Sequence, residues 1–402
     1  MSATKTGQVV LAALCDYAAR YGKGLEFQGI VESLEKEPSK LRVMGIFRDR
    51  GSYCGKFKLI DVLPGGNLLF RGVVLLEKVL GRVGIKLPAR HIQDTLFDWM
   101  ASRRIPQDCA VLMTLPGMVR TLKRAKALGA QTVLHGVVMH PTYNRKLLER
   151  CYTNPSKYPA VWDNRMITAL ERSMDLFDVV ICPSSAAAES YVQNGFPADK
   201  VFVAPLGFER PQLKPEILPW GSGERLKVVF VGNITKMKGC DILLQAATML
   251  DESRFEFHIC GDVQCDLKAE VTLLQRVRSN VIFHGYVPSL QIYPKCHVLV
   301  FMSLSEGLPK ALLEASFSGL LVVANKYSHA DLIVNGETGL ICDHDAVRLA
   351  TILDDVERHR DKYLDMRRQL QLACQCLSWT RFGRDVQAVL LRLTKTRMNK
   401  GH

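Results

Sequence analysis

The chain has 402 residues, too many for one compact core, and this length suits two domains of about 200 residues each. A hydrophobic content of 48% with 23% charged residues excludes a disordered protein, and no stretch approaches the roughly 20 apolar residues that span a bilayer. The net charge of +13 is concentrated in residues 42–150, which hold 19 basic and 7 acidic side chains. This region favours an anionic partner, such as acidic lipid, a diphosphate-bearing acceptor or nucleic acid, unless the whole proteome is basic.

The first half of the chain alternates apolar strands with amphipathic helices, which is typical of parallel sheets covered by helices. The apolar run at residues 9–14 is too short for the core of a secretion signal and predicts a first buried strand. Further strands are expected at residues 41–47, 110–115, 132–135, 179–182 and 201–204. Helices are expected at residues 25–37, 118–128 and 164–176, and a Ser184-capped helix is expected to stop at Gly195.

Residues 205–225 interrupt this alternation with four prolines and three glycines, and they predict a linker. A second series follows, with strands expected at residues 227–231, 255–260, 281–283, 298–302 and 320–324. Helices are expected between them at residues 240–250, 267–277 and 309–318. The fold class is therefore α/β, with two doubly wound Rossmann-like domains that face a central cleft at the carboxyl ends of their strands.

The twelve cysteines are scattered and match neither a common zinc spacing nor a Cys-x-x-Cys redox motif. Most of them stand in apolar runs, as Cys182, Cys260 and Cys342 do, where a thiol behaves as a small hydrophobic group. We therefore expect a reduced, cytoplasmic protein.

A glycine turn and a basic loop follow a predicted strand in the segment 229–239, VFVGNITKMKG. Gly232 lets the backbone turn away from the strand, and Lys238 lies just before the next helix. A cation beside the free N–H groups of a helix N-terminus suits a phosphate. The segment is neither a Walker A loop nor Gly-x-Gly-x-x-Gly, and a solvated loop with lysines is an equally good interpretation.

Two glutamates flank the start of a predicted helix in the segment 303–315, SLSEGLPKALLEA. Glu306 lies in the exit loop of a buried strand, Pro309 suits the first helical position, and Glu314 lies further along the helix. The free N–H groups of residues 307–310 form an anion site for a diphosphate, with one carboxylate available to a ribose and the other to a sugar. The alternative is a surface glutamate and a second glutamate that interacts with the helix dipole.

The segments 305–314 (SEGLPKALLE) and 333–341 (IVNGETGLI) together resemble the donor-binding region of glycosyltransferase family 4, the retaining GT-B enzymes of glycosyl transferases group 1. The Glu-x7-Glu spacing, the apolar turn and the Asn-Gly-x-Thr-Gly-Leu tract occur in the family's order. The resemblance extends over residues 110–385 and includes the loop 227–239, the turn 283–288 and the segments 178–184 and 205–209.

This resemblance implies a metal-independent hexosyltransferase that moves a sugar from a UDP- or GDP-sugar to a hydroxyl of a glycan or lipid-linked acceptor in polysaccharide or glycolipid synthesis. It assigns Glu306 to the transferred sugar, Glu314 to the ribose and Lys238 to the donor phosphates, and it implies no cofactor. Tyr286 and Val287 would lie beside the nucleobase. The other donor contacts that it implies are Gly22 and Gly24 in the loop after the first strand, and Gly232, Asn233, Gly307, Leu308 and Pro309.

The sequence departs from the family pattern at three places. Asn233 stands where the family usually has an arginine, which leaves the phosphate charge to Lys238 with help from Lys236. Residues 206–209 are Leu-Gly-Phe-Glu where Asn-Gly-Val-Asp is common, and residues 21–24 are Tyr-Gly-Lys-Gly in place of Gly-Gly-x-Glu.

Two histidines, His135 and His140, lie near the end of a predicted first-domain strand that faces the cleft. The residues from Pro141 onward resemble the helix that follows the sugar-proximal histidine in part of the family. We favour His140 over His135 for that position, and a purely structural role is an equally good alternative for either.

A retaining transfer of this kind needs little help from a side-chain base, because the leaving diphosphate can accept the acceptor's proton on the same face. Asp343 and Asp345 match an Asp-x-Asp metal motif of another transferase fold. Their position before a predicted helix indicates instead a turn and a helix cap, so we expect no metal site.

Residues 67–87 predict a basic amphipathic helix that either lies on an anionic membrane or covers the first sheet. We expect residues 1–208 to bind the acceptor, residues 209–380 to bind the donor, and residues 381–402 to form a helix that packs back on the first domain. The protein would be cytoplasmic and peripheral at the inner face of the membrane. The alternatives are a GT-B nucleotide-sugar epimerase and a non-enzymatic basic binding module, and no signature supports binding of nucleic acid.

Overall fold

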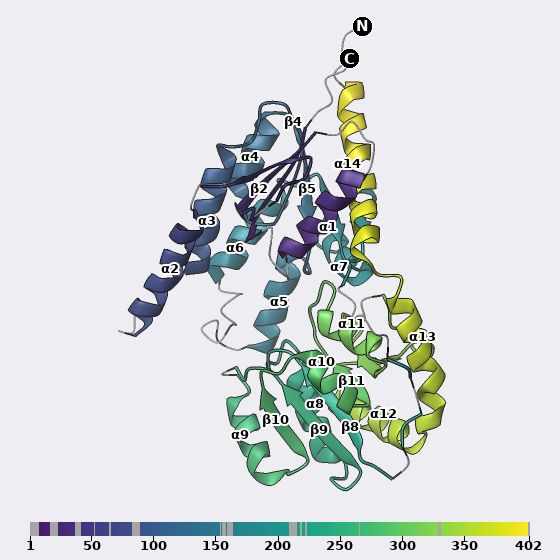
Figure 1. Cartoon of the computed structure of the whole chain (residues 1–402). Helices are drawn as coiled ribbons and strands as arrows, with labels where there is room; N and C mark the ends of the chain where they lie inside the picture. The colour runs from purple at the N-terminus through teal and green to yellow at the C-terminus, as the bar shows by residue number, and fades with distance from the viewer. Residues whose placement is uncertain are drawn as a thin grey trace.

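The computed structural model describes residues 8–16, 23–36, 42–51, 53–63, 66–82, 89–152, 154, 158, 164–208, 215–217, 219–221, 223–264, 266–328 and 331–400. Two parallel β-sheets, one from each half of the chain, are each covered by helices on both faces (Figure 1). This is the doubly wound α/β architecture that the alternation of strands and helices predicts. Within the described part of the chain, no helix has the length and apolar character needed to cross a membrane.

The first sheet has seven described strands in the order β3-β2-β1-β4-β5-β6-β7. The strand order reverses between β1 and β4, and in doubly wound sheets such a switch point opens a ligand crevice at the carboxyl ends of the strands. The short edge strand β3 was not predicted, because only one of its four residues is fully buried. The strands are β1 (Gln8–Asp16), β2 (Arg42–Asp49), β3 (Lys58–Asp61), β4 (Cys109–Thr114), β5 (Gln131–His135), β6 (Val179–Cys182) and β7 (Val201–Val203).

Two groups of helices cover the first sheet. Phe27 of α1 and Phe382 of α14 belong to the core on one face, whereas Phe70, Phe97 and Tyr191 bring α2, α3 and α7 to the core on the other face. The helices are α1 (Lys23–Lys36), α2 (Gly66–Gly81), α3 (Ala89–Ser102), α4 (Val119–Ala127), α5 (Pro141–Cys151), α6 (Asn164–Met174) and α7 (Ser185–Val192).

The second sheet has six described strands in the order β10-β9-β8-β11-β12-β13, all paired in parallel. Its own switch point lies between β8 and β11. The loops that follow these two strands therefore meet at the edge that faces the first domain. The strands are β8 (Leu226–Val231), β9 (Phe255–Cys260), β10 (Val281–Gly285), β11 (Val298–Phe301), β12 (Leu321–Ala324) and β13 (Leu340–Ile341).

The helices α8, α9 and α12 cover one face of the second sheet, and α11 and α13 cover the other. The core under α11 and α13 continues into the core under α1 and α14, so one hydrophobic cluster spans both halves. Burial raises the pKa of the thiols of Cys182, Cys260 and Cys342, in agreement with their expected apolar role. The helices are α8 (Cys240–Met249), α9 (Lys268–Val277), α10 (Ser289–Ile292), α11 (Lys310–Phe317), α12 (Ala346–Arg358) and α13 (Leu364–Cys374).

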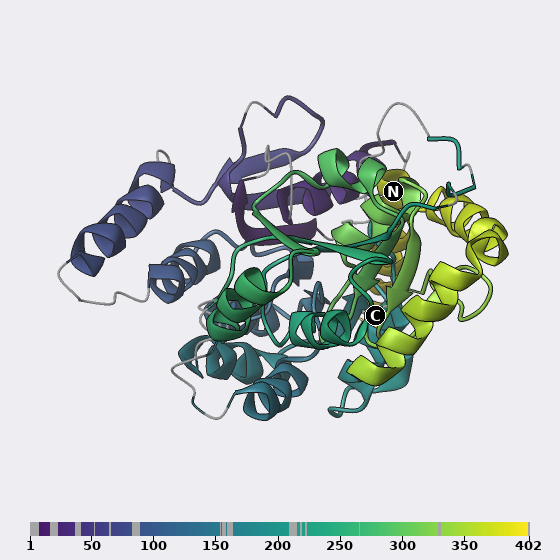
Figure 2. The same ribbon diagram turned by 90° about the horizontal axis from the view of Figure 1, so that it is seen from below.

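The last helix, α14 (Trp379–Lys400), returns from the second half and packs along α1, as Figures 1 and 2 show. The contact is close at its start, where a Cβ on Gly29 would lie 3.2 Å from the Trp379 ring. The predicted crossing helix is thus confirmed and begins two residues earlier than expected. The described residues of the expected linker 205–225 form no helix or strand, and residues 209–214, 218 and 222 lie outside the described part.

Candidate functional site

The loop between β8 and α8 is built on two glycines. Gly232 leaves β8 with a φ of 150°, and Gly239 precedes α8 as its N-cap with a φ of 66°. A Cβ on Gly239 would lie 2.2 Å from the carbonyl oxygen of Met302, so a larger residue would push the loop away from β11. Asn233 is exposed in the same loop.

The exit loop of β11 leads into α11 with free N–H groups. Pro309 has extended ψ and is the N-cap of α11, so the prediction that it occupies the first helical position was wrong by one residue. Its carbonyl oxygen accepts a hydrogen bond from Leu312 N at 3.1 Å. Among the described residues, the backbone N–H groups of Gly307, Leu308 and Lys310 have no acceptor. These unused donors lie where the sequence predicts an anion site, and binding of an anion there stays a prediction.

Lys238 and Glu306 meet at this cluster. The Nζ of Lys238 forms an ion pair with Oε1 of Glu306, which joins the loop after β8 to the loop after β11. The side chain of Lys238 is 33% exposed and that of Glu306 is 14% exposed, so the pair is partly accessible to solvent. One cation and one carboxylate thus stand side by side next to the free N–H groups.

The second glutamate lies one turn into α11, away from the ion pair. The hydroxyl of Ser289 donates to Oε2 of Glu314 at 2.6 Å, and Oε1 has no hydrogen-bond partner within the described residues. Ser289 begins α10 just after the turn that holds Tyr286 and Val287. Tyr286 is 82% exposed and Val287 packs against the core, so the turn has an exposed aromatic ring three residues before the serine that binds Glu314.

The first domain contacts the exit loop directly. A Cβ on Gly307 would lie 1.9 Å from the carbonyl oxygen of Val137, and the hydroxyl of Ser184 donates to the carbonyl oxygen of Gly307 at 2.7 Å. The hydroxyl of Tyr143 donates to the carbonyl oxygen of Leu304 at 3.1 Å, and burial raises the pKa of Tyr143 to about 12, which keeps this donor protonated. Both domains therefore hold the loop that carries Glu306.

These first-domain contacts were not predicted from the sequence. Ser184 was assigned only to capping α7, which it also does by accepting a hydrogen bond from Ala187 N at 3.3 Å. No local pattern reveals its second hydrogen bond, because the partner Gly307 lies 123 residues away.

His140 caps α5. Its Nδ1 accepts a hydrogen bond from the N–H of Thr142 at 3.2 Å, and its ring lies edge-on to Tyr191 with centroids 5.2 Å apart. Burial lowers the pKa of His140 to about 4, and this outweighs the opposing effect of Glu171. The neutral ring is therefore the cap, and the sugar contact assigned to His140 stays a prediction.

His135 ends β5 inside the first domain. Its Nε2 lies 2.8 Å from Oε2 of Glu26, and its ring packs against Phe27 and Phe382 with centroids 5.6 Å and 5.9 Å away. The side chain is 2% exposed, and its Nδ1 is buried without a hydrogen-bond partner in the described part of the chain. Glu26 lies in the first turn of α1, so His135 connects β5 to the segment that follows the glycine loop.

The remaining candidates are placed as follows. Gly24 is buried in the first turn of α1, and Gly22 lies outside the described residues. Lys236 does not join Lys238 at Glu306 but lines a different cavity. Asp345 caps α12 by accepting a hydrogen bond from Arg348 N at 2.7 Å, as its position before a helix predicted.

The family model of the glycosyl transferases group 1 matches residues 225–357, which include both loops, α11 and the Lys238–Glu306 pair. The second half of the chain is therefore similar to the glycosyl transferases group 1 over these residues. Lys238, Glu306 and Glu314 all lie within this group 1 segment. The first-domain residues that hold its exit loop, Val137, Ser184 and Tyr143, lie outside the matched region.

Three proteins illustrate what the chain is similar to. An alpha-1,4-N-acetyl-D-galactosaminyltransferase of Campylobacter jejuni, named for a diNAcBac-PP-undecaprenol-linked glycan, is 30% identical over 139 residues, which are 32% of this chain and 38% of that protein. The putative colanic acid biosynthesis glycosyltransferase WcaL of Salmonella typhimurium is 25% identical over 195 residues, which are 45% of this chain and 48% of that protein. The chain thus spans less than half the length of these two relatives.

The structure of HepE from Anabaena in complex with UDP and glucose is similar over 96% of this chain and 100% of that chain, with a TM-score of 0.60 and 15% identity. At this identity the likeness shows the fold alone. The fold is GT-B, with the two doubly wound domains and the crossing terminal helix that the sequence predicted.

Proposed function

We propose that the protein is a retaining family 4 glycosyltransferase that moves a sugar from a nucleotide-diphosphate sugar to a hydroxyl of a glycan or lipid-linked acceptor. The observation that carries this proposal is the Lys238–Glu306 ion pair beside the free N–H groups that lead into α11, with Glu314 further along that helix. We further propose that residues 1–208 bind the acceptor, residues 209–380 bind the donor and residues 381–402 stabilise the first domain.

The donor would lie along the carboxyl edge of the second sheet. Its diphosphate would accept hydrogen bonds from the free N–H groups of residues 307–310 and from Lys238, because a helix N-terminus and a cation both favour an anion. The free oxygen of Glu314 would accept a ribose hydroxyl, and Tyr286 with Val287 would contact the nucleobase. Gly232 and Asn233 would line the phosphates from the opposite loop, with Gly22 and Gly24 approaching them from the first domain.

Glu306 would hold the transferred sugar next to the bond that breaks. In the transfer, the bond from the sugar's C1 to the diphosphate oxygen breaks, and a bond from C1 to the acceptor oxygen forms on the same face. The acceptor's proton passes to the departing diphosphate. Lys238 and the N–H groups would stabilise the charge that develops on this leaving group, which is the main electrostatic contribution available here. The proposal assigns no metal and no cofactor to this step.

The two histidines would act differently from one another. His140 fits a role in holding α5, since its ring nitrogen is used as a helix cap. His135 fits better near the donor, because it ends β5 two residues before Val137, which touches Gly307. With both sides of its ring enclosed, His135 would position Glu26 and the start of α1 rather than contact the sugar itself.

The acceptor would be reached at an anionic membrane, with the protein peripheral at the inner, cytoplasmic face. Helix α2 projects from the body of the first domain in both overall views (Figures 1 and 2). Its outer face has exposed leucines, with Leu68 at 75% and Leu75 at 63%, an extent of apolar exposure that is unusual on a surface without a partner. The exposed basic side chains on and beside the same helix are Arg71, Lys78 and Arg82. Apolar residues flanked by basic residues suit the interface of an anionic bilayer.

Donor binding can be tested by melting the protein with a panel of UDP- and GDP-sugars. A ligand at about 100 times its Kd adds about 2.7 kcal/mol, which raises the melting temperature by roughly 5–10 °C for domains of this size. We expect one nucleotide family to give this shift in the wild type and a clearly smaller shift, at the same ligand concentration, in Lys238→Gln. Absence of any shift across the panel would contradict the proposal.

A further inference from the structure

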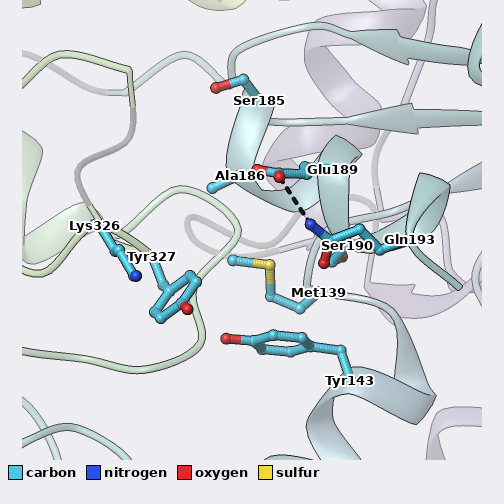
Figure 3. Close-up of a pocket in the computed structure, with 9 residues that line it drawn as sticks. All are labelled: Met139, Tyr143, Ser185, Ala186, Glu189, Ser190, Gln193, Lys326 and Tyr327. Atoms are coloured by element: carbon cyan, nitrogen blue, oxygen red, sulfur yellow. Dashed lines mark hydrogen bonds between the residues drawn. The ribbon is translucent and has the colours of Figure 1, made fainter.

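Two neighbouring cavities lie between the domains, and of the residues expected at the donor only Lys236, the expected helper of Lys238, lines one of them. One has a volume of about 430 Å³ and lies against α7, and the other has about 480 Å³ and lies against α5 and the start of α8. They share Tyr143, Lys326 and Tyr327 and form one groove, which we call the α5 groove. Figure 3 shows the smaller cavity. Neither cavity is lined by Lys238, Glu306 or Glu314.

Three cationic side chains converge on the larger cavity from three separate segments. Arg150 comes from α5 of the first domain, Lys236 from the loop after β8, and Lys326 from the loop after β12. Within the described residues none of the three forms an ion pair, whereas Arg254, for example, pairs with Asp354 and Glu357. Cations gathered without counterions favour an anionic ligand.

The acidic groups in the same cavity only partly offset this charge. Asp241 and Asp343 line it, and burial raises the pKa of Asp241, which disfavours its charged form. The Oδ1 of Asp241 and the Nε2 of His344 have no hydrogen-bond partner within the described part of the chain. The lining of this cavity therefore has more cations than carboxylates, and it includes two buried polar atoms that are available to hydrogen-bond a ligand.

The rest of the groove suits a hydroxylated ring. The rings of Tyr143 and Tyr327 lie on opposite domains with centroids 6.0 Å apart and frame the junction of the two cavities. Beyond them, Figure 3 shows Glu189 and Gln193 of the α7 region facing the opening, joined by a hydrogen bond of 2.8 Å from Nε2 of Gln193 to Oε1 of Glu189. Aromatic faces with amide and carboxylate groups can take the apolar face and the hydroxyls of a sugar.

We propose that the α5 groove is a second ligand site that binds a phosphate-bearing carbohydrate, with the phosphate among Arg150, Lys236 and Lys326 and the sugar ring beside Tyr143 and Tyr327. Arg150 belongs to the first domain and the two lysines belong to the second. A bound ligand therefore contacts both domains and stabilises their present arrangement. This site does not depend on the donor assignment, because Lys238, Glu306 and Glu314 line neither cavity.

Calorimetry on the full chain with glucose 6-phosphate, inorganic phosphate and methyl α-glucoside tests this site. We expect glucose 6-phosphate to bind more tightly than either of the other two probes. Arg150→Gln and Lys326→Gln are each expected to weaken its binding about tenfold or more, and Lys326→Arg is expected to retain it. In a second experiment the ligand is a polyprenyl-diphosphate sugar in detergent. Tighter binding of this ligand than of glucose 6-phosphate would identify a lipid-linked carbohydrate as the ligand of the site.

Two matched variants separate this site from the donor site and from general charge effects. Lys268→Gln removes an exposed cation on α9, and Lys238→Gln removes the cation of the donor site, so both should bind glucose 6-phosphate as the wild type does. Loss of binding in Lys238→Gln with full binding in Arg150→Gln and Lys326→Gln would overturn the proposal. Equal affinity for inorganic phosphate and glucose 6-phosphate would overturn the sugar part.

Discussion

Lys238 and Glu306 form an ion pair across 68 residues of sequence, between the loops that follow β8 and β11. Each side chain neutralises the charge of the other. A bound diphosphate would compete with Glu306 for Lys238, and the hydroxyls of a transferred sugar would replace Lys238 at Glu306. The pair therefore couples phosphate binding to the release of the carboxylate that the sugar needs.

Replacing Lys238 should weaken binding of the nucleotide. Lys238→Gln is expected to lower the affinity for UDP or GDP about 10- to 100-fold, because a hydrogen bond to a charged group contributes about 1.5–3 kcal/mol. Calorimetry with the nucleoside diphosphate measures this. Lys295→Gln, an exposed cation of the same domain, is the matched control and should bind as the wild type does. Unchanged affinity in Lys238→Gln would remove Lys238 from the phosphate site.

The proposed contact between Glu314 and the ribose can be tested with nucleotides that differ in their sugar. Glu314→Ala is expected to weaken binding of the nucleoside diphosphate by about 1.5–3 kcal/mol, since it removes a charged acceptor. The wild type should also bind the 2′-deoxynucleotide more weakly than the ribonucleotide, and Glu314→Ala should bind both equally. Ser289→Ala, which leaves the carboxylate in place, should have a smaller effect. If Glu314→Ala still bound the ribonucleotide more tightly than the 2′-deoxynucleotide, another group would contact the ribose.

The contact between the domains at Gly307 should not tolerate a side chain. In Gly307→Ala the new Cβ would meet the backbone oxygen of Val137 at 1.9 Å, so the exit loop or the first domain must shift. We expect weaker donor binding and a larger radius of gyration in X-ray scattering. Gly72→Ala is the control, because a Cβ there meets nothing within 4 Å, and it should be neutral or slightly stabilising in α2. Unaltered binding and scattering in Gly307→Ala would refute the role of this contact.

Stability should fall in acid through His140. Burial lowers its pKa from 6.5 to about 4 in the folded protein, so between these values the unfolded chain binds the proton and the folded chain does not. The contribution is complete above about pH 6.5 and is lost as the pH falls toward 4, with an upper bound of about 3 kcal/mol. His140→Asn keeps a capping oxygen and cannot titrate. Denaturant unfolding between pH 7 and 4 should therefore show a smaller loss in this variant, and an equal loss would contradict the assignment.

The exposed face of α2 should determine membrane binding. The wild type is expected to sediment with vesicles that contain phosphatidylglycerol and less with phosphatidylcholine alone, and added salt should reduce but not abolish the binding. Replacing Leu68 and Leu75 together by serine should weaken binding about tenfold or more, because apolar area leaves the interface. Leu372→Ser on α13, which is 49% exposed, is the matched control. Equal vesicle binding of the double variant and the wild type would contradict a role of α2 in membrane binding.

The elements around the donor site were predictable because their signals are local. The strand, proline and glutamate spacing of residues 298–314 placed β11, its exit loop and α11 correctly, apart from the shift of Pro309 to the N-cap. A proline avoids a lost hydrogen bond at either position, so the sequence does not distinguish them. Helix α3 (Ala89–Ser102) was not predicted, and neither was β3.

The orientation of side chains across the domains could not be predicted. Lys236 and Lys238 are two residues apart in one loop, yet Lys238 meets Glu306 and Lys236 turns to the cavity that Arg150 lines. His135 and His140 were both placed near the end of one strand, with His140 favoured for the sugar, but His135 pairs with Glu26 and His140 caps a helix. Such differences depend on the packing of distant segments, and no spacing within a single element encodes them.

The most direct test of the central claim is the anomeric configuration of the product, read by NMR during reaction with the nucleotide sugar that binds. We expect the wild type to transfer the sugar with retained configuration. We expect Glu306→Gln to transfer it far more slowly but to bind the nucleoside diphosphate at least as tightly, because Lys238 is released. Inverted product, an epimerised nucleotide sugar, or equal transfer by Glu306→Gln would contradict this claim.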